Sequence, residues 1–165
     1  MRWITYFILA YVMVGIQAGL SGVIDVWAAR PDLALICVVF IAMNAPRDAA
    51  LLGAFVLGGM QDLMTVQPLG LHAIAYSLAA MFTFSAAPIV HRTHPLSHFS
   101  LCFVGSILVA GAMLLHSTIY KSGPPVTVLF YGALFTGIVA VPVLGVLQRI
   151  RKIFAFQKRT GGSRQ

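Results

Sequence analysis

The run VTVLFYGALFTGIVAVPVLGVL, residues 126–147, decides the fold class, because it contains no charged side chain and is long enough to cross a membrane. A transmembrane helix needs about 20 apolar residues to span the hydrocarbon core. Toward the N-terminus, five further apolar runs follow one another, separated by short breaks with turn-forming residues. The six predicted transmembrane helices are residues 3–24, 31–45, 49–63, 71–90, 99–120 and 126–147.

The composition agrees with a membrane protein. Hydrophobic residues make up 59% and charged residues 9% of the chain, whereas soluble domains average roughly 45–50% and about 25%. Six crossings of about 20 residues use roughly 120 positions, which leaves too little for a soluble catalytic module, a nucleotide-binding domain or a receptor ectodomain. We therefore predict one all-α integral membrane domain, residues 1–148, followed by a basic cytoplasmic tail, residues 149–165.

The basic residues predict the orientation. The chain has 11 Lys and Arg residues and 4 acidic residues, all of them aspartate. An even number of spans places both termini on one side, and only Arg30 and Lys121 then lie on the other side. By the positive-inside rule both termini are expected in the cytoplasm. Because the basic residues gather at span ends and in the tail, we expect contact with membrane lipids and no nucleic-acid partner.

Small residues recur at helical spacing in the predicted spans. Ala50, Ala54 and Gly58 are four residues apart and lead to Asp62, and Gly15 and Gly19 form a G-x-x-x-G pattern. Such stripes let helix backbones approach closely in a membrane. We expect them to pack within the chain, although a partner's helix or a homodimer would use the same pattern.

Two aspartates stand out because charge is costly near membrane depth. Asp32 follows Pro31 in the first turn of the second predicted helix, where the helix dipole favours a carboxylate. Asp62 ends the third helix, where the dipole disfavours it, so it needs a basic partner such as Arg30 or a cation of another protein. Both lie on the predicted outer side, and we expect them to share one polar pocket with Arg30, Gln61 and His72.

No pattern in the sequence indicates catalysis or a bound metal. The spacing of His91, His94 and His98 would suit Zn²⁺ on one helical face, but Pro95 interrupts that face, and we interpret the segment as a solvated cytoplasmic linker. No nucleophile, oxyanion donor or phosphate-binding loop accompanies the aspartates. We therefore expect a non-enzymatic protein without metal or cofactor.

Three strings in a fixed order resemble a known family. Arg30-Pro31-Asp32-Leu33 opens a short span, Gln61-Asp62-Leu63 closes the next, and Pro68-Leu69-Gly70-Leu71-His72-Ala73 leads into the fourth. Together they resemble the MreD family of bacterial rod shape-determining membrane proteins. The distinctive strings lie within residues 30–76, and the likeness extends over the whole length as six apolar helices with a basic tail.

The resemblance implies a scaffold of the elongasome, which builds peptidoglycan, in the bacterial inner membrane. MreD-like proteins are expected to bind the single-span protein MreC, and through it MreB, the polymerase RodA and its partner transpeptidase. The prolines and Gly70 would shape the outer turns, Gly58 would allow close helix approach, and the aspartates would form a polar lock or meet the partner. The positions carried over are Pro31, Asp32, Gly58, Asp62, Pro68 and Gly70.

The family is also similar in fold to the substrate-binding subunits of energy-coupling-factor vitamin transporters. This likeness keeps a second hypothesis open, in which the protein captures a small molecule between the outer helix ends as a transporter subunit. The long outer loops that usually close a vitamin site are absent from the predicted layout, which favours the scaffold.

Overall fold

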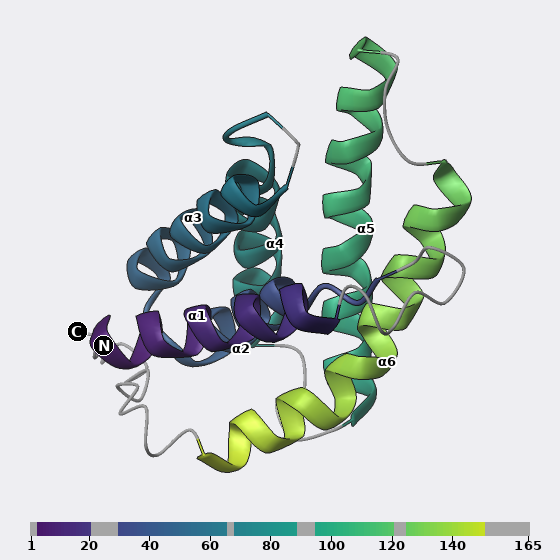
Figure 1. Ribbon diagram of the computed structural model, residues 1–165. Helices are drawn as coiled ribbons and strands as arrows, with labels where there is room; N and C mark the ends of the chain where they lie inside the picture. Colours follow the sequence, from purple (N-terminus) through teal and green to yellow (C-terminus); the bar gives the residue numbers. More distant parts are fainter. Residues whose placement is uncertain (1–2, 21–29, 66–67, 89–94, 121–124, 151–165) are drawn as a thin grey trace, which may run out of the picture.

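A computed structural model describes residues 3–20, 30–65, 68–88, 95–120 and 125–150, and these residues form an all-helical fold (Figure 1). The described part contains six helices: α1 Trp3–Leu20, α2 Leu33–Asn44, α3 Arg47–Met64, α4 Leu71–Ala86, α5 Pro95–Tyr120 and α6 Val126–Ile150. The predicted all-α class and the number and order of helices are confirmed within these residues.

Helix α2 is the centre of the fold. Every side chain from Leu33 to Met43 is buried, and α2 contacts each of the other five helices. Its side chains are apolar on all sides, which suits a helix that is buried by its neighbours on every side. The remaining helices form a layer around it, with α3 packed on α4 and α5 packed on α6.

The small-residue stripe of α3 packs inside the molecule, as predicted. Ala50, Ala54 and Gly58 are all buried. A Cβ atom added at Gly58 would lie 2.5 Å from the carbonyl oxygen of His72 and 2.6 Å from the amide nitrogen of Ala73. The backbones of α3 and α4 therefore touch at Gly58, and only glycine fits there.

The corresponding prediction for α1 is wrong. Gly15 and Gly19 are exposed, and a Cβ atom at either position would meet nothing within 4 Å. Helix α1 instead packs through the opposite face, where the Tyr6 hydroxyl donates a hydrogen bond to the carbonyl oxygen of Gly53 in α3. The glycine face of α1 is left on the outer surface.

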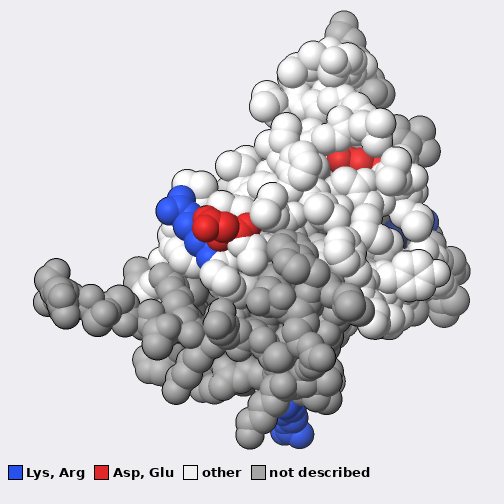
Figure 2. Space-filling model, turned by 90° about the vertical axis from the view of Figure 1, so that its left-hand side faces the viewer, with Lys and Arg blue, Asp and Glu red and all other residues white. Residues whose placement is uncertain are grey.

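The outer surface is strongly apolar. Large hydrophobic side chains are exposed on α1, α3, α4, α5 and α6, among them Tyr11 at 73% and Leu115 at 67% exposure. Figure 2 shows one face on which charged atoms of the described residues form only a few small groups. Two helices, Leu96–Tyr120 and Val126–Arg149, are long and apolar enough to cross a membrane, and Tyr6–Gly19, Leu33–Asn44 and Leu71–Ala86 are shorter apolar helices.

Helix α5 begins earlier than predicted. The described part of the helix already includes Pro95, four residues before the predicted start at Phe99. His98 is therefore inside the helix and only 4% exposed, so its assignment to a solvated linker is wrong. His91 and His94 lie outside the described residues.

Pro142 does not end α6, which continues to Ile150. Figure 1 shows α6 bending in its C-terminal part, as expected for a proline that removes one backbone hydrogen bond and crowds the preceding turn. The tail beyond Ile150 lies outside the described residues.

Candidate functional site

The predicted outer residues gather at one end of the molecule, where α2 begins, α3 ends and α4 begins. Arg30 is exposed at this end, Pro31 is buried and Asp32 is half-buried. Gln61 and His72 are buried beside them. The structure thus brings three segments that are distant in sequence to one region: residues 30–32 before α2, Gln61 in α3 and His72 in α4.

Asp32 caps helix α2 and ties it to two other helices. Its carboxylate accepts the Leu35 amide at 2.9 Å, which is the usual role of an aspartate before the first helical turn. The Tyr76 hydroxyl of α4 lies 2.7 Å from both carboxylate oxygens. The Asp32 amide donates to Thr136 Oγ1 of α6 at 2.9 Å. The start of the central helix is therefore fixed by α4 and α6 together.

Asp62 replaces the missing cap of helix α4. Gly70 precedes that helix and has no side chain to bind the free amides. Asp62 accepts the amides of Gly70 at 2.8 Å, His72 at 3.0 Å and Ala73 at 3.3 Å. The carboxylate that the dipole of α3 disfavours is thus stabilised by the N-terminus of α4, where negative charge is favoured.

The basic side chain beside Asp62 is His72 rather than Arg30. His72 Nδ1 lies 2.7 Å from Asp62 Oδ1. Because an ionised carboxylate can only accept, the hydrogen of this contact belongs to Nδ1. All of these contacts serve the α3–α4 turn, so Asp62 acts first as part of the fold.

The turn also depends on Gly70, which has a φ angle of +101°. This left-handed conformation is costly for residues with a side chain. Pro68 lies two residues earlier and is exposed, and its carbonyl oxygen accepts the Leu71 amide at 3.3 Å. Gly70 therefore adopts the left-handed conformation of the turn, and Gly58 lies where the backbones of α3 and α4 touch.

Helix α4 connects the two aspartates, which do not bond to each other. His72 and Tyr76 are one turn apart on α4, with ring centroids 5.8 Å apart in an edge-on arrangement. His72 binds Asp62 at the end of α3, and Tyr76 binds Asp32 at the start of α2. The two aspartates are therefore held by separate contacts, made by neighbouring side chains of one helix.

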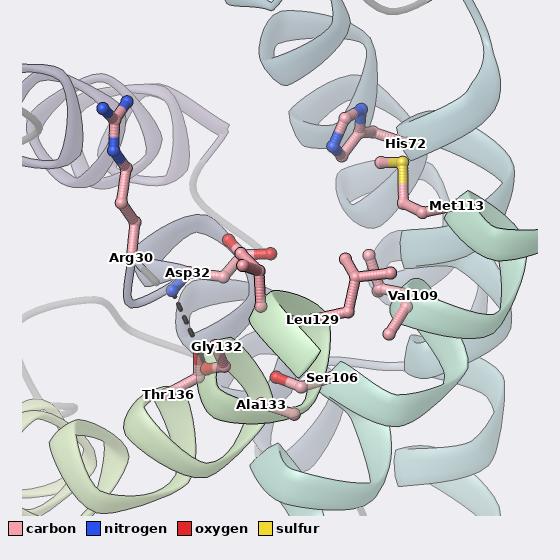
Figure 3. Close-up of a pocket in the computed structure, with 12 residues that line it drawn as sticks. Arg30, Asp32, His72, Ser106, Val109, Met113, Leu129, Gly132, Ala133 and Thr136 are labelled. Atoms are coloured by element: carbon pink, nitrogen blue, oxygen red, sulfur yellow. Dashed lines mark hydrogen bonds between the residues drawn. The ribbon is translucent and has the colours of Figure 1, made fainter. Parts of the chain in front are cut away.

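Two cavities adjoin Asp32. The first, about 200 Å³, lies between α4, α5 and α6 (Figure 3). It is lined by Arg30, Asp32, His72, Ser106, Val109, Ala110, Met113, Val128, Leu129, Gly132, Ala133 and Thr136. The second, about 340 Å³, lies between α1, α2 and α3 and is lined by Val14, Gln17, Ala18, Arg30, Pro31, Asp32, Gln61, Met64 and Thr65. Asp62 lines neither cavity.

Sequence reasoning missed four residues of this region. Tyr76 and Thr136 bind Asp32, Ser106 lines the first cavity, and Gln17 Oε1 accepts the Ala34 amide at 3.0 Å. Each is a polar residue inside an apolar run, and polar groups buried among membrane helices are hydrogen-bonded or functional. That rule, applied to hydroxyl and amide side chains as well as charges, could have found them.

Within the described residues, no group of three or more His, Cys, Asp or Glu side chains is placed to hold a metal ion. The carboxylates instead accept hydrogen bonds from amides, a phenol and an imidazole. This arrangement can fix helix ends and bind a polar group at the cavity mouth.

Comparison with known proteins gives one match. No curated protein and no solved structure shows a significant match to the chain. The family model described as rod shape-determining protein MreD matches residues 1–150, which includes all six helices and every residue of the site above. The chain therefore belongs to the MreD family, the membrane-associated proteins that act in determining rod cell shape.

Proposed function

We propose that the protein is a non-enzymatic membrane scaffold of the elongasome that binds MreC and thereby supports peptidoglycan synthesis and rod shape. The observation that carries this proposal is the MreD family match over residues 1–150. MreB, RodA and its partner transpeptidase would join through MreC.

The proposal includes six membrane crossings in the bacterial inner membrane, with both termini in the cytoplasm. Exposed apolar side chains on five helices support it, since lipid replaces water around such surfaces. The orientation is supported by the basic residues, because nine of them lie on the side of the two termini in this layout and two on the other side. Residues 1–148 would form the membrane domain, similar in fold to energy-coupling-factor subunits, and residues 149–165 the cytoplasmic tail.

The glycine face of α1 is the surface best suited to the single span of MreC. Gly15 and Gly19 are exposed and bordered by Tyr11 and Ile16, which are exposed as well. A helix can approach a small-residue stripe closely, and packing contacts are the main source of affinity between helices in lipid. The same face would serve a homodimer, which is the competing use of this surface.

At the outer end, Arg30, Pro31, Asp32 and Gln61 would meet the part of MreC that continues beyond the membrane. Arg30 is exposed there, so an oppositely charged partner could reach it. The residues that hold the α3–α4 turn would support this surface, as their contacts indicate. They are Gly58, Asp62, Pro68, Gly70 and His72.

Purification of the tagged protein from native membranes in mild detergent, with quantitative mass spectrometry of MreC, tests the proposal. Gly15→Leu is expected to reduce MreC recovery about tenfold without lowering the yield of folded protein, because Gly15 is exposed and a Cβ atom there has no heavy atom within 4 Å. Gly111→Leu is the matched control, since Gly111 of α5 is equally unobstructed. Equal MreC recovery from both variants would exclude the α1 face.

The cavity of about 340 Å³ favours a second candidate, a small-molecule-binding subunit of an energy-coupling-factor transporter. Its volume falls at the lower end of small-molecule sites, which span about 300–1,000 Å³. Recovery of transporter ATPases or a vitamin in the same purification, with no MreC, would establish this candidate in place of the scaffold.

A further inference from the structure

The side-chain amide of Gln61 is buried and has no hydrogen-bond partner within the described residues. Gln61 lies in the last turn of α3 and is 9% exposed. Its main-chain carbonyl accepts from Thr65 Oγ1 at 3.1 Å, but neither end of its side-chain amide is bonded to another described residue. Asn44 of α2, in contrast, donates its side-chain amide to the Phe40 carbonyl at 2.7 Å. Because an unpaired buried amide destabilises a fold, such a group usually meets a ligand or an ordered water.

Gln17 of α1 supplies a second amide with uncommitted donors. Its Oε1 atom accepts the Ala34 amide at 3.0 Å. Since a backbone N–H group can only donate, the oxygen end of the Gln17 amide must face α2. The Nε2 end, which has two N–H donors, forms no hydrogen bond with another described residue. The bond to α2 therefore fixes where these two donors are presented.

Both glutamines line the cavity of about 340 Å³ between α1, α2 and α3. Two charged residues, Arg30 and Asp32, line it as well. They are opposite in sign, and each has a contact of its own, which for Asp32 is the Tyr76 hydroxyl. The cavity thus presents no net formal charge, and its uncommitted polar groups are neutral amides. A ligand that matches it is polar and uncharged.

The rest of the lining narrows the class of ligand further. The apolar part is formed by Val14, Ala18, Pro31 and Met64. No aromatic ring is among the described residues of the lining, which disfavours a ligand held by ring stacking, such as a nucleobase. Small aliphatic groups beside the amides suit a ligand with short apolar substituents.

An extended peptide has the groups that such a cavity binds. Residues of a strand point their N–H and C=O groups to the same side. A glutamine amide can donate to that carbonyl and accept from that N–H group, so Gln61 can bind both groups of one residue. Gln17 Nε2 can donate to a second carbonyl. Hydrogen bonds to the main chain are a common source of affinity in peptide recognition and depend little on the side chains of the peptide.

We propose that this cavity binds the main chain of an extended, uncharged peptide segment through hydrogen bonds with the amides of Gln61 and Gln17. The proposal rests on the proposed function, because it assigns the segment to MreC at the point where MreC leaves the membrane. The cavity lies where α2 begins and α3 ends, which is the outer end of the molecule in the proposed orientation. This occupant competes with the small molecule of the transporter candidate for the same cavity.

Binding of full-length MreC to the full-length protein in lipid nanodiscs tests the proposal. Gln61→Met keeps the length of the side chain and removes the amide. We expect it to weaken MreC binding about tenfold, through the loss of two neutral hydrogen bonds. The unfolding temperature should not fall, because the amide bonds to no other described residue. Gln148→Met is the matched control, since Gln148 Nε2 is also buried and unpartnered among the described residues but lies in α6, outside the lining.

Equal MreC affinity of the wild-type and Gln61→Met proteins would overturn the proposal. Failure of the proposed function is a different result, in which the wild-type protein itself forms no complex with MreC. A complex that is weakened by Gly15→Leu and unaffected by Gln61→Met would leave the scaffold standing and exclude the cavity as the site of the peptide.

Short blocked peptides test the chemistry of the cavity without any variant. The probes are N-acetyl-trialanine amide, the same peptide with every main-chain nitrogen methylated, and glucose, each followed by saturation-transfer NMR on the wild-type protein in detergent. We expect the first peptide to bind and to compete with MreC, and the methylated peptide to bind about tenfold more weakly, because it lacks main-chain N–H donors. No binding of the first peptide, equal binding of the two peptides, or tighter binding of glucose would overturn the proposal. A peptide that binds without competing with MreC would overturn the assignment of the segment to MreC.

Discussion

Replacing Gly58 with alanine should destabilise the protein more than the same change at Gly53 or Gly59, the other glycines of α3. The new Cβ atom would lie 2.5 Å from the His72 carbonyl oxygen, against an ordinary contact distance of at least 3.4 Å. The two helices would have to separate by about 0.9 Å, which is the difference between these distances. The obstructing atoms, among them the His72 carbonyl oxygen and the Ala73 amide nitrogen, belong to the backbone and cannot rotate away.

This separation also reaches the Asp62 contacts, because Asp62 lies one turn beyond Gly58 on the same face of α3. Moving α4 by the same amount would stretch the bond from the Gly70 amide, now 2.8 Å, beyond hydrogen-bonding range. Overpacking costs about 1–3 kcal/mol, and a weakened bond to a charged group costs about 1.5–3 kcal/mol. The higher helix propensity of alanine offsets about 1 kcal/mol. The expected net loss is about 1.5–5 kcal/mol.

Thermal unfolding in detergent, followed with a thiol-reactive fluorescent probe, measures the effect. Cys37 and Cys102 are both free and buried, so they react only when the helices separate. A loss of this size should lower the unfolding temperature by about 3–20 °C, at about 2–4 °C per kcal/mol for a chain of this length.

Gly59→Ala is the matched control, one residue away in the same helix. Nothing lies within 4 Å of a Cβ atom there, so the substitution should be neutral or slightly stabilising. If Gly58→Ala unfolds at the same temperature as Gly59→Ala, the close approach of α3 and α4 described above is wrong.

Three further substitutions test the turn and the caps by the same assay. Gly70→Ala should lower the free energy of unfolding by about 1–2 kcal/mol because of the left-handed backbone at this position. Gly70→Asn should lower it by less, and equal losses in the two variants would show that the φ angle is not the cause. Tyr76→Phe should lower the free energy of unfolding by about 1.5–3 kcal/mol, because it removes the hydroxyl that binds the Asp32 carboxylate. Ser77→Ala on the same helix should lower it by less, and identical losses in the two variants would contradict the Tyr76 contact. Asp62→Ala should lower the free energy of unfolding by about 3–5 kcal/mol, because it leaves His72 and the first amides of α4 without their hydrogen-bond acceptor. Asp62→Asn should lower it by less, and a fully stable Asp62→Ala protein would refute the capping role of Asp62.

Much of the fold follows from the sequence because apolar runs with polar breaks leave few alternatives in a membrane protein. Helix boundaries between residues 31 and 86 were predicted to within a few positions. Residues 95–98 were left out of the predicted fifth helix because Pro95 was interpreted as an interruption, although proline can also lie within a helix. Its position alone does not separate the two roles.

The site was predicted less completely than the fold. Asp32 and Asp62 were found because charges are rare in apolar runs, but their partners depend on which helix faces cross. The sequence shows that Asp62 needs a stabilising group and cannot show that the group is the N-terminus of α4, since this depends on the turn at Gly70. The two small-residue stripes are equivalent in sequence, and only packing separates the buried one in α3 from the exposed one in α1.

The most direct test of the scaffold proposal is a binding measurement with two purified components, this protein and full-length MreC, in one lipid nanodisc preparation. The account predicts a stable complex that forms without any other elongation protein and is weakened by Gly15→Leu but not by Gly111→Leu. Absence of a complex under conditions in which both proteins remain folded would contradict the proposal that the MreD-family chain binds MreC directly.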